Sequence, residues 1–142
     1  MLDWLIGFWP TLLGLAVLFW AAFRFARWQQ IRGKCLGRPH RATISWLGSY
    51  ADAFQRVLDL IPQVEAEILD ADPNHGYVLA SAEGSFRTFG TTVRINLITQ
   101  EGVTFVQIEA GPSASIFDWG ESRSLVNRFL QLWDRLPSPV VA

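Results

Sequence analysis

Residues 4–23 read WLIGFWPTLLGLAVLFWAAF, and Thr11 is the one plainly polar side chain among these twenty residues. A helix rises about 1.5 Å per residue, so this run spans roughly 30 Å, the thickness of the hydrocarbon core of a bilayer. A helix buried against a protein core would show a polar face, which this run lacks. The sequence therefore predicts one transmembrane helix, which together with its interfacial flanks covers residues 1–28.

The composition of the run supports this interpretation. Indole rings favour the interface between lipid and water, and the tryptophans lie toward the two ends of the run, at Trp4, Trp9, Trp20 and Trp28. Small groups that would let a neighbouring helix pack closely lie on one side, at Gly7, Thr11 and Gly14. The run holds no histidine. Imidazole ligation of a haem or chlorophyll within the span is therefore excluded, and we expect no cofactor.

Charge sets the expected orientation of this helix. Only Asp3 and the amino terminus precede the apolar run, whereas residues 24–41 hold no acid and form a basic collar of Arg24, Arg27, Arg32, Lys34, Arg38 and Arg41. Basic residues stay on the cytoplasmic side, which predicts an outer N-terminus and a cytoplasmic domain at the inner membrane, plasma or photosynthetic. A cleaved signal peptide would begin with basic residues and have a shorter apolar stretch, so we expect a retained anchor.

The rest of the charge distribution excludes one class of partner. Residues 42–142 contain six basic and twelve acidic side chains, a net charge of −6. An acidic domain does not favour nucleic-acid binding. The collar, which extends into a linker over residues 29–40, is instead expected to contact anionic lipid headgroups.

Residues 41–136 have the pattern of one small α+β domain. Ser49 is expected to cap a first helix that Pro62 ends, and Asp118 and Glu121 have capping-box spacing before a last helix with an apolar stripe. The strands are predicted from alternation and turn signals at Arg41–Trp46, Val64–Ile68, Tyr77–Ser81, Phe86–Thr99 and Val103–Ala110. The tail, 137–142, is expected to be extended. This order, β-α-β-β-β-β-α, predicts an antiparallel sheet with two helices on one face.

Two parts of the domain resemble known families. The order of elements over 41–136 resembles a shortened helix-grip domain, as in the START and pollen-allergen families, which implies a pocket for a lipid or another apolar ligand. The stretch Phe117-Asp-Trp-Gly-Glu-Ser-Arg123 before a terminal helix is similar to the ending of uncharacterised bacterial and cyanobacterial membrane-associated domains. That second resemblance implies a family and no activity.

Residues that carry chemistry are few. The two histidines, His40 and His75, lie far apart, and neither has a partner at metal-ligand spacing. Nucleotide-binding and nucleophile motifs are also missing, so we expect neither a metal site nor an enzyme. Cys35 is the one cysteine; it is either an inert thiol or, beside the membrane, a palmitoylation site.

Three residues near the last helix are candidates for docking a partner, namely Trp119, Arg123 and Trp133. An arginine and a tryptophan beside a helix start can anchor an interaction. In the alternative, structural interpretation, Asp118 caps the helix, Trp119 covers a sheet edge and Gly120 permits the turn.

The features together favour a non-catalytic accessory or assembly subunit of a larger integral membrane complex, by analogy a photosynthetic or respiratory one. Its partners would be the other subunits and membrane lipids. The alternative is a membrane-tethered domain that binds a lipid or another apolar ligand, which would need a cavity of several hundred cubic ångströms.

Overall fold

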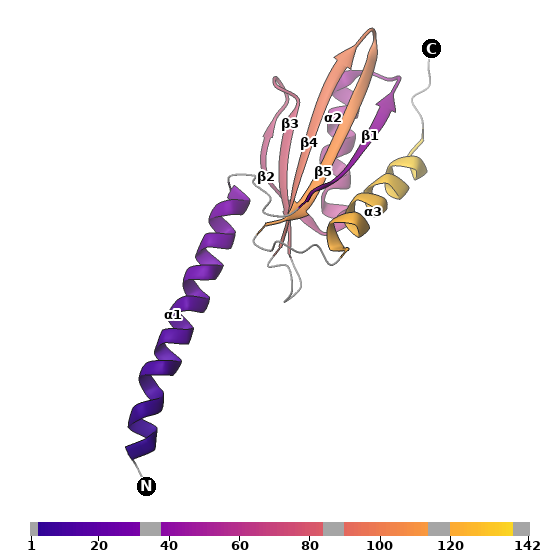
Figure 1. The fold of residues 1–142 in the computed structure, drawn as a ribbon. Helices are drawn as coiled ribbons and strands as arrows, with labels where there is room; N and C mark the ends of the chain where they lie inside the picture. Colours follow the sequence, from indigo (N-terminus) through magenta and orange to yellow (C-terminus); the bar gives the residue numbers. More distant parts are fainter. Residues whose placement is uncertain (1–2, 32–37, 84–89, 114–119, 138–142) are drawn as a thin grey trace.

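The computed structural model describes residues 3–31, 38–83, 90–113 and 120–137 (Figure 1). The elements follow in the order α1 (Asp3–Ile31), β1 (His40–Trp46), α2 (Tyr50–Leu60), the 3-10 helix η1 (Pro62–Val64), β2 (Ala66–Asp72), β3 (Tyr77–Ala82), β4 (Thr91–Gln100), β5 (Val103–Pro112) and α3 (Glu121–Arg135). The predicted α+β class and element order are confirmed, with η1 as an addition.

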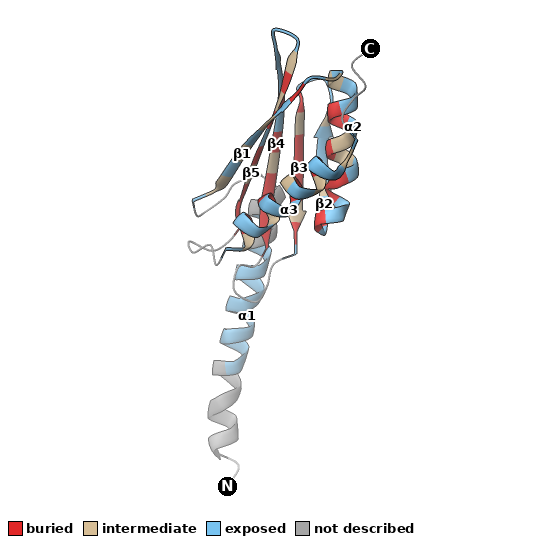
Figure 2. Cartoon of the chain, turned by 90° about the vertical axis from the view of Figure 1, so that its right-hand side faces the viewer, coloured by how far each residue is buried: buried red, intermediate tan, exposed pale blue. Residues whose placement is uncertain are grey.

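The five strands form one antiparallel sheet in the order β1-β5-β4-β3-β2. The first strand therefore lies beside the last, and β1 and β2 are the two edges. Helices α2 and α3 pack on the same face of the sheet, and among the described residues no helix covers the opposite face (Figure 1 and Figure 2). The predicted arrangement of two helices on one face is confirmed.

The core lies between this face of the sheet and the two helices. Alternate residues of the central strands point into it, as the sequence predicts for Val93, Ile95 and Leu97, and the largest wholly buried side chain is Phe129 of α3. Burial of each large apolar side chain contributes roughly 1.5–3 kcal/mol. The alternation of apolar and polar residues therefore determines which face of each strand α2 and α3 cover.

Helix α2 begins where the sequence predicts. The hydroxyl of Ser49 accepts a hydrogen bond of 3.1 Å from the backbone N–H of Asp52, and the helix ends at Leu60, just before Pro62. Strand β2 begins at Ala66 rather than at Val64. Its start is displaced because Pro62 opens a 3-10 turn and Glu65 adopts a left-handed φ of 61°.

Helix α3 begins directly after a glycine in a left-handed conformation. Gly120, with φ of 90°, is the N-cap residue of this helix. The predicted capping box of Asp118 and Glu121 stays a prediction, because Asp118 lies outside the described residues. The predicted apolar stripe is confirmed, because Val126, Phe129 and Trp133 are buried.

Strand β4 is shorter than the prediction. It begins at Thr91, after Gly90, and the expected start at Phe86 lies outside the described residues. Two residues, Glu101 and Gly102, connect β4 to β5 with φ values of 50° and 80°. Positive φ at both positions makes this the type I′ turn that suits a two-residue hairpin.

Candidate functional site

Helix α1 presents an apolar surface to its surroundings. Every side chain described between Leu12 and Phe25 is exposed, and so is Trp28 (Figure 2). The large apolar members are Leu12, Leu13, Leu15, Val17, Leu18, Phe19, Trp20, Phe23, Phe25 and Trp28. Soluble monomers rarely expose apolar patches of more than a few hundred square ångströms. We call these side chains the apolar surface of α1.

The ends of the apolar run are described in part. The guanidinium of Arg24 lies 5.3 Å from the ring centroid of Trp20, and Phe25 and Trp28 have centroids 5.9 Å apart. An added Cβ at Gly14 would meet nothing within 4 Å, which leaves room for a close neighbour there. Within the described residues, no helical stretch is both long and apolar enough to cross a membrane.

Several candidate residues lie wholly or in part outside the described residues. Trp4, Gly7, Trp9 and Thr11 belong to α1, but their side chains are outside the described set, as is that of Arg27. Arg32, Lys34, Cys35 and Trp119 lie outside the described residues altogether. Arg38 is exposed just before β1.

Arg41 of the basic collar lies in the sheet, within the predicted first strand. It lies in β1, where its Nε donates to Glu109 Oε2 at 2.9 Å, while Arg94 of β4 donates to Oε1 of the same carboxylate at 2.6 Å. Burial would raise the pKa of Glu109, but the hydrogen bonds from Arg41 and Arg94 outweigh it, so the pKa lies below its usual range. Arg41 therefore ties β1 to β5 on the face without helices.

Arg56 joins the two helices of the domain. Its guanidinium carbon lies 4.5 Å from the ring centroid of Trp46 and 4.9 Å from that of Trp133, and these rings meet edge to face at 5.5 Å. Nη1 donates to the carbonyl of Pro137 at 3.0 Å and Nη2 to that of Trp133 at 2.9 Å. Burial lowers the pKa of Arg56. We call Arg56, Trp46 and Trp133 the arginine clamp.

The clamp changes the interpretation of Trp133. This ring is 5% exposed, so it is a core residue in the structure and not part of an exposed docking surface. Sequence reasoning did not single out Arg56. Its partners lie 77 and 81 residues away in the chain, and no local spacing signals such a contact.

A depression of about 340 Å³ borders the clamp, lined by Trp46, Asp52, Gln55, Arg56, Asp59, Leu136 and Pro137. It is an open hollow between α2 and the end of α3, with two carboxylates and an amide on its rim. Sites for apolar ligands enclose most of the ligand in apolar side chains. This hollow does not have that form, which weakens the argument for a lipid pocket.

A second depression, of about 540 Å³, runs along the outer side of α3 and is lined by Gly120, Arg123, Ser124, Asn127, Arg128 and Gln131. Arg123, the remaining described docking candidate, is exposed there. Arg128 forms a loose ion pair of 3.6 Å with Glu65. We call this surface the α3 outer face; its two arginines and two amides suit polar or acidic groups of a partner.

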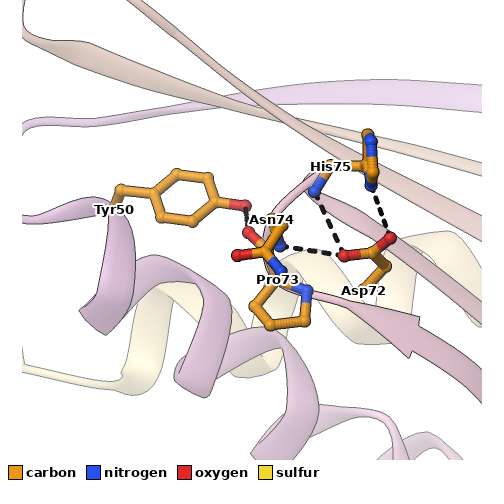
Figure 3. A network of polar contacts seen from close by, with 5 residues as sticks. All are labelled: Tyr50, Asp72, Pro73, Asn74 and His75. Carbon is orange, nitrogen blue, oxygen red and sulfur yellow. Dashed lines mark hydrogen bonds and ion pairs between the residues drawn. The ribbon is translucent and has the colours of Figure 1, made fainter.

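The turn between β2 and β3 holds the second histidine (Figure 3). His75 Nδ1 lies 2.6 Å from Asp72 Oδ2, and the phenol of Tyr50 donates to the carbonyl of Pro73 at 2.7 Å. The hydrogen bond from His75 lowers the pKa of Asp72, and burial raises that of Tyr50. The histidine side chain is 82% exposed. Among the described residues no cluster of three potential metal ligands occurs.

No family model matches the chain, and no curated protein matches it significantly. Among solved structures the chain is similar to the solution NMR structure of a Thermobifida fusca protein determined by the Northeast Structural Genomics Consortium. The two share 12% sequence identity with a TM-score of 0.47, over 70% of this chain and 95% of that chain.

Proposed function

We propose that this protein is a non-catalytic, single-pass accessory or assembly subunit of a larger integral membrane complex. In this proposal α1 is the anchor, the amino terminus lies outside and the α+β domain is cytoplasmic. The observation that carries it is the apolar surface of α1, whose described side chains from Leu12 to Phe25 are all exposed. Lipid tails and neighbouring helices are the surroundings that suit such a surface.

The charge pattern supports the orientation. Six basic side chains and no acid lie in residues 24–41, which favours a cytoplasmic position for everything that follows. The domain would then stand directly below the lipid headgroups, and the collar would contact their anionic groups. Arg41 contributes least to this contact, because it is engaged by Glu109.

We further propose that the domain docks on the complex through the α3 outer face. Arg123, Asn127 and Gln131 are exposed there, whereas Trp133 is not. Helix α3 is fixed to α2 by the arginine clamp, so the face is presented by a rigid element. Rigid presentation reduces the entropy lost on binding.

The test is purification of the tagged full chain from its native membrane in mild detergent, with mass spectrometry of the proteins that accompany it. The proposal expects stoichiometric recovery of one integral membrane complex. Recovery should be lost when residues 1–34 are replaced by an unrelated anchor, and reduced by Arg123→Glu but not by Gln55→Glu on α2. A monomer with bound lipid and no protein partner would contradict the proposal and favour the ligand-binding alternative.

A further inference from the structure

The two edges of the sheet differ in a way that bears on self-association. Edge strand β2 is interrupted by a bulge between Ile68 and Asp70, and it carries the acids Glu67, Asp70 and Asp72. Bulges and charges are common protections of an edge against pairing with another chain. Edge strand β1 has neither protection: its seven residues pair with β5 without a break, and Arg41 is its one fully charged side chain.

The register shows which backbone groups of β1 point away from the sheet. Ser113 N–H donates to the carbonyl of Gly90, just before β4. The odd-numbered residues of β5 therefore direct their backbone N–H and C=O groups toward β4. The even-numbered residues of β5 direct these groups toward β1, where their partners are His40, Ala42, Ile44 and Trp46. In an antiparallel strand, successive residues direct their backbone N–H and C=O groups to opposite sides of the strand. The N–H and C=O groups of Arg41, Thr43 and Ser45 thus lie on the free edge.

These three residues have no backbone partner within the described parts of the chain. Their side chains are exposed on the face without helices. Figure 2 looks onto the helix-covered face of the sheet, and in that view β1 lies at the left edge with no described strand beyond it. The edge is therefore open to a further strand.

We propose that β1 pairs antiparallel with β1 of a second copy of this chain, about a twofold axis at Thr43. Thr43 then lies opposite Thr43 of the copy, and Arg41 lies opposite Ser45 of the copy. This register engages all three outward residues of each strand and forms six backbone hydrogen bonds, two for each directly opposed pair. The result is a continuous ten-stranded sheet, twice the five strands of one copy.

Self-complementarity favours a second copy and this register. The Thr43-centred pairing places Ala42 beside Ile44 of the copy on the helix-covered face, which extends the apolar layer. Charges also fit, because Arg41 meets a serine, whereas centring on Arg41 would oppose two like charges. Pairing centred on Ala42 or Ile44 would leave outward groups of the strand unpaired.

The proposed contact is a single pair of seven-residue strands, which is small for a stable complex. The inference therefore rests on the proposed anchor, which holds two copies in one membrane and raises their effective concentration. The experiment below separates the two proposals, because membrane fractionation reports the anchor and cross-linking reports the edge.

The test uses the full chain in membranes with Cys35→Ser, so that each variant carries one introduced cysteine. Directly opposed strand residues have Cα atoms about 5.5 Å apart, within the range of a disulfide. Oxidation should therefore cross-link Thr43→Cys into a dimer. Arg41→Cys is the matched control, since four residues of stagger place it about 14 Å from its own copy. Absence of the Thr43→Cys dimer, or equal cross-linking of Arg41→Cys, would overturn the proposal.

A charge exchange tests the same contact without oxidation. Thr43→Lys should reduce co-purification of two differently tagged copies about fivefold, because two lysines would face each other across the axis. Thr43→Glu should do the same, and a mixture of the lysine and glutamate variants should restore wild-type recovery. The exposed position of Thr43 makes both variants compatible with folding. Unchanged recovery with Thr43→Lys alone refutes pairing through β1. If fractionation finds the chain outside the membrane, the anchor proposal fails, and both readouts still test the edge in solution.

Discussion

Gly76 fastens the β2–β3 turn to the middle of the sheet. Its φ is +65°, and its carbonyl accepts a hydrogen bond of 2.8 Å from Leu97 N–H. A Cβ at this position would lie 2.4 Å from the carbonyl oxygen of Leu97. The residue therefore combines a left-handed backbone with a close approach that only glycine allows.

We expect Gly76→Ala to lower the free energy of unfolding by about 2–4 kcal/mol, from backbone strain and overpacking together. Gly102→Ala is the matched control. Its φ is +80°, but an added Cβ there meets nothing within 4 Å, so about 1–2 kcal/mol of strain alone is expected. Urea unfolding of the full chain followed by circular dichroism measures both. Equal losses at the two glycines would show that the contact with Leu97 has no energetic weight.

Glu109 makes the stability of the folded domain depend on pH. Burial opposes its charged form, yet hydrogen bonds from Arg41 and Arg94 lower its pKa in the folded state. A carboxyl group with a lowered folded pKa stabilises the fold above its unfolded pKa of about 4.3. That contribution is lost as the pH falls through the lower folded value.

The prediction concerns Glu109→Gln. Compared with the wild type, the variant should be less stable at pH 7, and the difference should shrink toward pH 3. Urea unfolding at the two pH values measures this. A stability difference that stays constant over this interval would contradict the assignment of the ion pairs at Arg41 and Arg94.

At the scale of elements, the arginine clamp joins α2 to the end of α3. Arg56 contributes two hydrogen bonds to backbone carbonyls and two contacts with aromatic rings. Its removal leaves carbonyl groups without a partner and a gap between two tryptophans. Such a loss acts on the docking of two helices rather than on either helix alone.

We expect Arg56→Ala to cost about 2–4 kcal/mol of unfolding free energy, from the two hydrogen bonds and the cation–π contacts together. Arg56→Lys should recover less than half of this, because one ammonium cannot reach both carbonyls and stack on both rings. Arg123→Ala, on the exposed side of α3, serves as the control and should change stability by under about 0.5 kcal/mol. Hydrogen exchange of α3 amides should rise in Arg56→Ala; unchanged protection would count against the clamp.

Local patterns predicted the elements well. Alternation predicted the inner residues of β1 and β4, and helical spacing predicted the buried stripe of α3. The start of β2 was harder to predict, because Pro62 opens a 3-10 turn and Glu65 adopts a left-handed backbone. These positions depend on how the chain meets its neighbours, which the spacing of residues does not encode.

Contacts between distant residues account for the rest. The sequence predicted neither the contact of Arg56 with Trp133 nor the ion pairs of Glu109 with Arg41 and Arg94, because the partners lie on different elements. It predicted the strand that contains Arg41, which begins one residue earlier at His40, but not the ion pair of Arg41 with Glu109. Of the docking candidates, Arg123 lies on the α3 outer face and Trp133 in the core.

At the scale of the whole molecule, the chain combines an apolar helix with a small domain whose exposed sides differ. The α3 outer face is polar and partly basic, the face of the sheet without helices carries ion pairs, and the free edge of β1 offers backbone groups. In the proposed function, the helix places these surfaces at the membrane. The proposed roles of all three surfaces therefore depend on α1 as the membrane anchor.

Extraction of membranes at alkaline pH tests that central claim most directly. The full chain should stay in the membrane pellet, whereas a variant with Val17→Arg and Leu18→Arg should be released, since each arginine at the centre of a span costs about 2.5–3.5 kcal/mol. Thr43→Ala, outside the apolar run, should stay with the membrane as the wild type does. Release of the wild-type chain into the alkaline supernatant would contradict the account.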